Sequence, residues 1–480
     1  MGRLAVFCFF SYNQQMDTAQ FLSLLQEFRQ NHILDHFRKL DSGQQEKLLR
    51  EAGELDLPLV FDLFRLHSRD PKAEKGIGKI SPAPVIGIPK TPEDFQGREK
   101  ARVLGESLLR GGKVAVLIVA GGQGSRLGFE GPKGNFPLSP LRKKPLFQLF
   151  AEAVKALCRR YEVEIPLVIM TSKENEAETR RFFEEKRCWG LASPVYFFSQ
   201  AMLPTLTLEG NLILSDETNF LANPDGHGGS LKAFYESGML SKLRKRGYTE
   251  LFYCQVDNPL VKIADPVFLG YHRLAEAEIS TKVVRRRDPD EKVGIYGLLD
   301  GKPGIIEYSD FPPAEYRAVD ERGWIRHWAG NIAVHVISLS FIKRLNRRGF
   351  ALPYHRAVKD VEGIGRDGRP EKIKGLKFES FVFDAIPLAE RTSCMEVLRE
   401  EEFSPVKNKE GRDSPETARA AMINLHRKWL EQAGAEVAPD VRVEISPLFA
   451  LDKEELAEKI SGKGLKIKED LYLDEIAKSY

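Results

Sequence analysis

Cysteine, long apolar runs and an excess of charge of one sign are all scarce in this chain of 480 residues. The five cysteines are odd in number and scattered, without a C-x-x-C spacing, and the nine histidines form no pair at metal-ligand spacing. These patterns argue against a disulfide framework and against a zinc site. We therefore expect reduced thiols and a cytoplasmic protein; the residues concerned are Cys8, Cys158, Cys188, Cys254 and Cys394.

No apolar run approaches the roughly 18 residues that a membrane-spanning helix needs. Lysine and arginine number 72 against 69 acidic residues, which leaves a formal net charge of only +3. This balance argues against a nucleic-acid-binding surface. We expect neither a membrane nor a nucleic acid as partner, so local basic clusters must recognise any anion.

The N-terminus resembles a signal peptide only superficially. Arg3 precedes the short apolar run Leu4–Phe10, but no small-x-small cleavage site follows it. We expect residues 1–15 to be a disordered or mis-assigned extension and Met16 to be the working start.

The stretch Val114–Gly134 carries the strongest chemical signal. Six apolar residues run into a loop that contains Ala120, Gly121, Gly122, Gln123 and Gly124, and Arg126 and Lys133 follow it. Glycine can adopt positive φ, so we expect Gly121, Gly122 and Gly124 to bring backbone N–H groups close to phosphate oxygens. The spacing differs from G-x-G-x-x-G, because Leu127 stands at the third glycine position, and G-K-[ST] is absent. The stretch predicts a buried strand that opens into a loop for a nucleoside triphosphate.

The pattern A-G-G-x-G-[ST]-R-L-G, followed by P-K-G, resembles the nucleotide-binding loop of sugar nucleotidyltransferases, specifically of the eukaryotic-type UDP-N-acetylhexosamine pyrophosphorylases. The resemblance extends from about residue 98 to about residue 434. It implies uridylyl transfer from UTP to N-acetylglucosamine 1-phosphate, giving UDP-N-acetylglucosamine and pyrophosphate. In this reading, Arg126, Lys133 and Lys407 are the catalytic cations, and Lys407 lies in Ser404–Asn408, which is similar to the family's S-P-L-K-N.

Two further segments resemble the family's nucleotide contacts. Gln200 begins Q-A-M-L-P, where the family has Q-G-M-L-P, and its amide can both donate to and accept from the edge of uracil. Ala201 in place of glycine requires a negative φ there. Gly226 and His227 lie in a loop similar to P-D-G-N-G-G, with His227 in place of asparagine.

The resemblance also implies sugar and metal contacts. Glu307 and Asn331 lie in segments similar to E-Y-S-E and A-G-N, which hold the sugar, and Phe381 and Phe383 match the apolar face beside the acetyl group; as plain sequence the two phenylalanines fit core alternation better. Asp257, in V-D-N, is the candidate ligand for Mg²⁺ or Mn²⁺, because Mg²⁺ accepts one or two carboxylates with phosphate and water. Asp384 is a weaker second candidate, and an N-cap for a helix at Ala385 explains it nearly as well.

Alternating strand and helix patterns predict an α/β fold with a doubly wound, mostly parallel sheet. The resemblance implies that this is the Rossmann-like fold of nucleotidyltransferases. We expect a helical N-terminal region and linker over residues 16–110, a catalytic domain over 111–398 and a small α+β C-terminal domain over 399–480. Helices are expected at 98–110 and 231–246, and an extended linker at 70–92.

Two other functions stay open. The first is a UTP–glucose-1-phosphate uridylyltransferase, because His227 stands where the family that acts on N-acetylated sugars has asparagine. The second is a non-catalytic nucleotide-binding regulator that has the same fold. An enzyme is favoured over a regulator, because a binding protein has no need of Arg126, Lys133, Asp257 and Lys407 together. We expect UTP and a sugar 1-phosphate as its substrates. We also expect a monomer or weak homodimer.

Overall fold

The structure is a computed structural model that describes residues 16–69, 78–365 and 369–475. The expected extension at residues 1–15 lies outside them. The chain divides into two compact units, and the first is assembled from three separate segments, Met1–Ile77, Gln200–Ser237 and Arg344–Ala385. The remaining segments, Gly78–Ser199, Gly238–Lys343 and Ile386–Tyr480, form the second unit. These boundaries do not coincide with the sequence-based divisions after residues 110 and 398.

Four amphipathic helices open the first unit, as the apolar periodicity predicts. Asp17 and Asp41 each form a capping box, with Gln20 and Gln44, that satisfies the first N–H groups of α1 and α3. Phe21 and Phe61 pack in one core with Phe378 from a much later segment. The helices are α1 (Thr18–Glu27), α2 (Asn31–Lys39), α3 (Ser42–Gly53) and α4 (Leu57–Arg69).

The rest of the first unit contains short strands and one helix. A long hairpin of β13 (His355–Ile364) and β14 (Pro370–Glu379) pairs with β6 (Leu206–Thr207). Separately, β5 (Met202–Pro204) pairs antiparallel with β7 (Ala222–Pro224). The helix α8 (Gly229–Glu236) follows β7. The sequence predicts one helix over residues 231–246, but α8 ends at Glu236 and α9 (Met239–Lys245) starts anew, because Gly238 has a left-handed backbone with φ 76°.

The second unit is organised around a ten-stranded mixed sheet among the described residues. Its central order is β1-β10-β12-β8-β2-β3-β4, with β9, β11 and β15 joined beside it. Only β8, β2, β3 and β4 form a continuous parallel set, so the sheet is more mixed than the sequence predicts. The strands are β1 (Ile80–Pro82), β2 (Val114–Val119), β3 (Leu167–Thr171), β4 (Val195–Ser199), β8 (Glu250–Gln255), β9 (Ile279–Arg285), β10 (Ile295–Leu299), β11 (Lys302–Ile306), β12 (Ala329–Ser338) and β15 (Thr392–Glu396).

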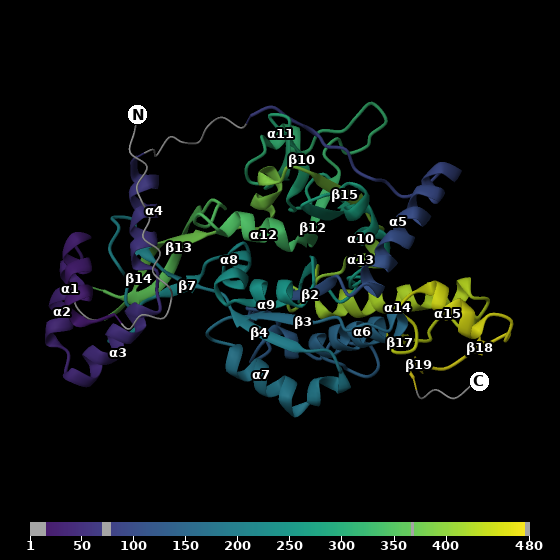
Figure 1. Cartoon of the computed structure of the whole chain (residues 1–480), viewed down its shortest axis with the longest axis horizontal. Helices are drawn as coiled ribbons and strands as arrows, with labels where there is room; N and C mark the ends of the chain where they lie inside the picture. The colour runs from purple at the N-terminus through teal and green to yellow at the C-terminus, as the bar shows by residue number, and fades with distance from the viewer. Residues whose placement is uncertain (1–15, 70–77, 366–368, 476–480) are drawn as a thin grey trace. The chain divides into compact units, whose positions relative to one another are not determined.

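Helices flank this sheet, and Figure 1 shows α7 against β4. They are α5 (Pro92–Arg110), α6 (Leu146–Tyr161), α7 (Glu176–Glu185), the 3₁₀ turn η3 (Arg187–Gly190), α9, α10 (Pro266–Leu274), α11 (Pro313–Tyr316) and α13 (Arg399–Glu402), while α12 (Leu339–Asn346) starts in this unit. Gly105 and Gly270 let α5 and α10 meet closely, since a Cβ on either would lie 1.7 Å from a backbone oxygen of the other helix.

Two expectations about the segment before β2 need correction. The helix starts at Pro92 rather than Arg98, because Thr91 caps it and Pro92 occupies its first turn. Within the expected linker, Ile80–Pro82 is a strand that pairs with β10 at the sheet edge.

The C-terminal part of the chain begins with α14 (Pro415–Gln432), which Ser414 caps. Two parallel strand pairs and one helix then surround a small core that includes Leu430, Val443 and Leu456. The pairs are β16 (Glu436–Val437) with β18 (Lys466–Ile467) and β17 (Val443–Ile445) with β19 (Leu471–Leu473), and the helix is α15 (Lys453–Ile460). The C-terminal part therefore combines helices with short parallel strand pairs.

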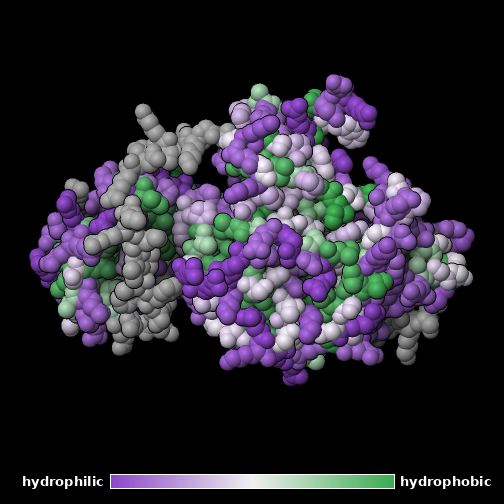
Figure 2. Space-filling model, turned by 45° about the horizontal axis from the view of Figure 1, so that its top comes forward, coloured by the Kyte–Doolittle hydropathy of each residue, from purple (hydrophilic) through white to green (hydrophobic). Residues whose placement is uncertain are grey.

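In the described part of the chain, no helix is long and apolar enough to cross a bilayer. The four described cysteines, Cys158, Cys188, Cys254 and Cys394, are free. On the face shown in Figure 2, hydrophobic residues occur in separate groups among hydrophilic ones.

Candidate active site

The strand order creates a switch point between β2 and β8. The chain proceeds from β2 to β3 and β4 on one side, whereas β8 pairs with β2 on the other side. Ligands of open α/β sheets bind outside the carboxyl ends of strands where the order reverses in this way. Val119 pairs with Gln255, so the loop after β2 and Asp257 leave neighbouring strand ends.

The loop after β2 is held by its own backbone. Lys133 donates its N–H to Gly122 O at 3.1 Å, and Gly124 donates to Gly131 O at 2.9 Å. The expectation of positive φ at Gly121, Gly122 and Gly124 is wrong: Gly124 has φ −80°, and the left-handed residues are Gly128 and Gly131. Gly124 is needed for space instead, since a Cβ there would lie 2.7 Å from the Phe129 ring.

Asn175 supports this loop from a neighbouring element, and sequence reasoning missed it. The side chain is fully buried; its amide donates to Ala120 O at 2.9 Å and its oxygen accepts the Ser172 N–H. Nothing in the local sequence distinguishes this asparagine from an ordinary residue before a helix.

Four predicted residues from distant parts of the chain interact at this sheet edge. Burial lowers the pKa of the Lys133 ammonium, Asp257 raises it, and the charges of Arg126 and Lys407 lower it further. Lys133 is half-buried and Asp257 is buried, while Arg126 and Lys407 are exposed. The result is a cluster of three cations and one carboxylate, suited to binding a polyphosphate.

Backbone and side-chain bonds to the loop after β8 hold Lys407 in this cluster. Val406 donates its N–H to Asp257 O at 2.8 Å. The buried Asn258 donates to Glu402 O at 2.7 Å and accepts the Ser404 N–H at 3.1 Å. Asn258, which we did not single out from the sequence, therefore fixes the segment that carries Lys407; we call residues 402–407 the lysine arm.

The predicted sugar contacts Glu307 and Asn331 lie on either side of Gly294. Asn331 donates its backbone N–H to Gly294 O at 2.8 Å, and a Cβ on Gly294 would lie 2.8 Å from a Glu307 carboxylate oxygen. Because β12 runs antiparallel to β8, its first residues, 329–331, lie at the same sheet edge as the carboxyl end of β8. A bulge follows Asn331, with Ala333 at φ 54°.

The first unit brings its own predicted residues together. Pairing of β5 with β7 places Gln200 and Ala201 beside the glycine loop, where Asp225 donates its N–H to Ala201 O at 3.1 Å. Gly228 donates to Ser380 O at 2.9 Å, and the Val382 N–H donates to Nδ1 of His227 at 3.2 Å. Ala201 has no left-handed backbone, so its replacement of glycine is tolerated.

Two aromatic rings flank His227, and the candidate carboxylate Asp384 contacts one of these residues and His355. The ring centroid of His227 lies 5.3 Å from that of Phe381 and 5.6 Å from that of Phe383. Asp384 accepts the Phe381 N–H at 3.3 Å and lies 2.8 Å from Nε2 of His355. Asp384 lies inside the 3₁₀ segment η4 (Val382–Leu388) rather than at an N-cap before Ala385.

Asp225 underlies the glycine loop as a buried acid. It is 1% exposed, and neither carboxylate oxygen has a hydrogen-bond partner. Burial raises its pKa to about 7, against the opposing charge of Lys232. A Cβ on Gly229 would lie 2.1 Å from this carboxylate, so the glycine makes room for it.

Comparison with known proteins shows the family of the chain. The model of the UTP–glucose-1-phosphate uridylyltransferase family matches residues 90–467. The UDP-N-acetylglucosamine pyrophosphorylase of Saccharomyces cerevisiae is 35% identical over 92% of this chain and 96% of its own length. The human UDP-N-acetylhexosamine pyrophosphorylase-like protein 1 is 34% identical over 94% and 96%.

A solved structure extends the likeness to three dimensions. The uridine diphosphate N-acetylglucosamine pyrophosphorylase of Trypanosoma brucei matches with a TM-score of 0.80 and 27% identity, covering 93% of this chain and 97% of that one. The chain therefore belongs to the UTP–glucose-1-phosphate uridylyltransferase family.

Proposed function

We propose that this protein transfers the uridylyl group of UTP to N-acetylglucosamine 1-phosphate. A phosphate oxygen of the sugar phosphate attacks the α-phosphorus of UTP, the bond from that phosphorus to the bridging oxygen breaks, and pyrophosphate leaves with the bond electrons. The products are UDP-N-acetylglucosamine and pyrophosphate. The convergence of Arg126, Lys133, Asp257 and Lys407 carries this proposal, and two relatives at 34–35% identity support the sugar class.

Catalysis by these residues consists of positioning and charge stabilisation. Arg126 and Lys133 neutralise the triphosphate and the departing pyrophosphate, and the lysine arm brings Lys407 to the phosphate of the incoming sugar. Glu307 accepts hydrogen bonds from sugar hydroxyls, and Asn331 contacts the sugar or its acetamido group. The half-buried position of Lys133 strengthens its field, because fewer water molecules screen it.

A divalent cation fits the donor set at the sheet edge. Mg²⁺ prefers one or two carboxylates and fills its other positions with phosphate oxygens and water, and Asp257 supplies one buried carboxylate there. No cluster of three or more His, Cys, Asp or Glu side chains occurs in the described ranges, in keeping with a cation shared with the substrate. We assign Asp257 as its ligand; when bound, Mg²⁺ or Mn²⁺ would offset phosphate charge.

The test is a direct assay of the reaction. The full chain is incubated with UTP, Mg²⁺ and one of three sugar 1-phosphates, those of N-acetylglucosamine, N-acetylgalactosamine and glucose. Pyrophosphate release and the identity of the nucleotide sugar are recorded. We expect the highest kcat/KM with N-acetylglucosamine 1-phosphate; a preference for glucose 1-phosphate would contradict the sugar assignment, and no turnover with any sugar would contradict the reaction.

A further inference from the structure

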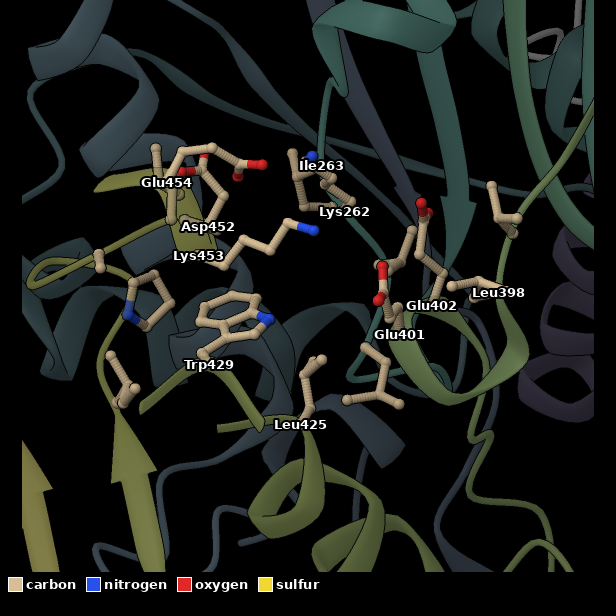
Figure 3. Close-up of a pocket in the computed structure, with 18 of the residues that line it drawn as sticks. Lys262, Ile263, Leu398, Glu401, Glu402, Leu425, Trp429, Asp452, Lys453 and Glu454 are labelled. Atoms are coloured by element: carbon tan, nitrogen blue, oxygen red, sulfur yellow. The ribbon is translucent and has the colours of Figure 1, made fainter. Parts of the chain in front are cut away.

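The second unit contains a cavity of about 550 Å³ that none of the residues assigned to the reaction lines. Its walls come from α6, from the loop after β8, from the segment leading into the lysine arm, and from α14 and α15 (Figure 3). This volume lies within the 300–1,000 Å³ typical of small-molecule sites.

One side of the cavity is apolar. Leu149, Leu260, Met422 and Leu425 form a buried cluster separate from the main core, and Trp429 packs against it while remaining partly exposed. Figure 3 shows the indole of Trp429 at the cavity. An exposed indole beside an apolar cluster favours a ring-containing organic group over an inorganic ion.

The charged side chains that line the cavity are nearly balanced, with four bases and five acids, and most of the acids are in ion pairs: Glu396 is paired with Arg285. Glu401 is paired with Lys428, Glu402 with Lys282, and Asp452 with Arg160. Among the described lining residues, Arg98, Lys453 and Glu454 have no ion pair within 4 Å, and the ammonium of Lys262 lies 3.9 Å from Asp265. The amino group of Lys453 points toward Lys262 and Ile263 in Figure 3. The lining charges without an ion pair are thus two cations, Arg98 and Lys453, and one acid, Glu454, and this local excess of cations favours an anionic group on the ligand.

The cavity wall is joined directly to the reactive cluster. Residues 259–262, which line the cavity, follow Asp257 and Asn258 in the chain, and Leu260 donates its N–H to Asn258 Oδ1 at 3.4 Å. The same Asn258 side chain binds Glu402 O and Ser404 N in the lysine arm. A ligand that presses on residues 260–262 or on Glu402 must therefore also act on the position of Lys407.

We propose that this cavity is an effector site for an amphipathic organic anion, whose ring packs on Trp429 and the apolar cluster and whose acidic group lies near Lys453 and Lys262. Its occupancy changes substrate binding through Asn258 and the lysine arm. That the cavity binds such an anion, the binding part of the proposal, depends on the cavity alone. That its occupancy changes substrate binding, the coupling part, rests on the proposed function.

The probe for the binding part is 1-anilinonaphthalene-8-sulfonate, an aromatic sulfonate that fluoresces in apolar surroundings. Titration of the folded full chain is expected to show one saturable site with energy transfer from tryptophan, and Trp429→Phe should remove most of that transfer. Ala153→Phe, which fills the cavity from α6, should weaken binding at least tenfold, and Lys453→Met should weaken it severalfold. The matched control Lys463→Met, at an exposed position that does not line the cavity, should leave the Kd unchanged.

Equal Kd values in Ala153→Phe and the unaltered chain, or no saturable binding at all, would overturn the site. Circular dichroism of Ala153→Phe verifies its fold, and Lys453→Met tests the site independently should that variant not fold. Coupling is measured as the Kd of the probe with and without saturating UDP-N-acetylglucosamine, where linkage predicts a change of about fivefold or more. An unchanged Kd would overturn coupling while leaving the site, and failure of the nucleotide sugar to bind would count against the proposed function instead.

Discussion

At the scale of single residues, Arg126 gives the sharpest test of the mechanism. Its side chain is exposed, so Arg126→Ala should fold normally, as judged by an unchanged Tm. The loss of one preorganised charge should lower kcat on the order of a hundredfold or more. The matched control Arg181→Ala removes an exposed arginine from α7 and should keep full activity. Unchanged turnover in Arg126→Ala would remove Arg126 from the mechanism.

Asp225 makes stability depend on pH. Its pKa is raised to about 7 by burial, from 3.8, so the unfolded chain releases this proton at a lower pH than the folded one. The folded state therefore loses stability as pH rises from about 4 to about 7 and loses no more above that range. Each pKa unit corresponds to about 1.4 kcal/mol, so Asp225→Asn should gain a few kcal/mol over the unaltered chain between pH 4 and pH 8. Urea unfolding at the two pH values measures this.

Asp216 supplies a control of opposite sign. Burial raises its pKa, but hydrogen bonds from Thr218 and Asn219 together lower the pKa by more, so the net shift is downward. Ionised Asp216 therefore stabilises the fold above its unfolded pKa, and Asp216→Asn should be less stable at pH 8 than the unaltered chain. If both substitutions changed stability in the same direction, the assigned cause of the Asp225 shift would be wrong.

The sequence predicted which motif residues lie together better than it predicted the backbone geometry of the loop after β2. Arg126, Lys133, Asp257 and Lys407 do interact, because the segments after β2 and β8 leave neighbouring strand ends and the lysine arm is bonded to Asp257. We did not single out Asn175 and Asn258 from the sequence, because each stabilises the site through a hydrogen bond to a residue more than 50 positions away along the chain. Gly124 was recognised, but for a backbone reason rather than the steric one that applies.

At the scale of elements, Asn258 ties the loop after β8 to the lysine arm. Asn258→Ala removes three hydrogen bonds and leaves buried groups near Glu402 and Ser404 without partners. Each such group costs about 1–3 kcal/mol. We expect lower stability and a kcat/KM for the sugar 1-phosphate that falls at least tenfold, with a smaller effect on the KM for UTP. Asn258→Asp keeps the acceptor for Ser404, so its stability and its kcat/KM should lie between those of Asn258→Ala and the unaltered chain. Equal losses of kcat/KM for UTP and for the sugar 1-phosphate would argue against a role confined to Lys407.

The buried Lys282 of β9 also links Glu402 of the lysine arm to Asp265, the N-cap of α10. Its ammonium is fully buried and lies 2.9 Å from Asp265 and 2.5 Å from Glu402. Lys282→Met removes the cation that two buried carboxylates share, so unfolding in urea should show a loss of about 3–5 kcal/mol. The double variant Lys282→Met/Glu402→Gln should recover part of that loss, and no recovery would show that Glu402 is not the residue left unbalanced.

Elements with strong apolar periodicity were predictable from the sequence, whereas the interruption of a helix and a very short strand were not. The six apolar residues that open the stretch Val114–Gly134 do form a fully buried strand, β2, as the sequence predicts. The sequence-based prediction joined α8 to α9, because apolar spacing continues through Gly238 although the chain reverses its local twist there. It also read residues 80–82 as linker, since three residues carry no periodic signal and their pairing with β10 is a long-range contact.

At the scale of the whole molecule, removal of divalent cations separates chemistry from stability. The proposed cation is held by Asp257 together with the substrate, so we expect it to serve the reaction rather than the fold. A chelator should abolish uridylyl transfer, and added Mg²⁺ should restore it, while the Tm of the substrate-free protein changes by less than about 1 °C, which is the shift that roughly 1 kcal/mol produces in a chain of this length. A large fall in Tm would point to a structural metal and contradict the assignment of the cation to the substrate.

The division into two units from interleaved segments could not be read from the sequence. Periodicity marks the faces of α1–α4 as apolar, but it does not state which later segment covers them. Their partners Leu203 and Phe378 lie in segments of the first unit that are separated along the chain by the strands of the second.

Because the segments interleave, the core of the first unit is completed only late in synthesis. Phe21 and Phe61 are made early, whereas Phe378, which completes their core, is made about 300 residues later, some 15–60 s at typical elongation rates of ~5–20 residues per second. During that interval the nascent helices present an uncovered apolar face that favours chaperone binding or self-association. Ribosome-bound chains truncated before residue 376 should therefore be more protease-sensitive in residues 16–69 than chains extended past 385.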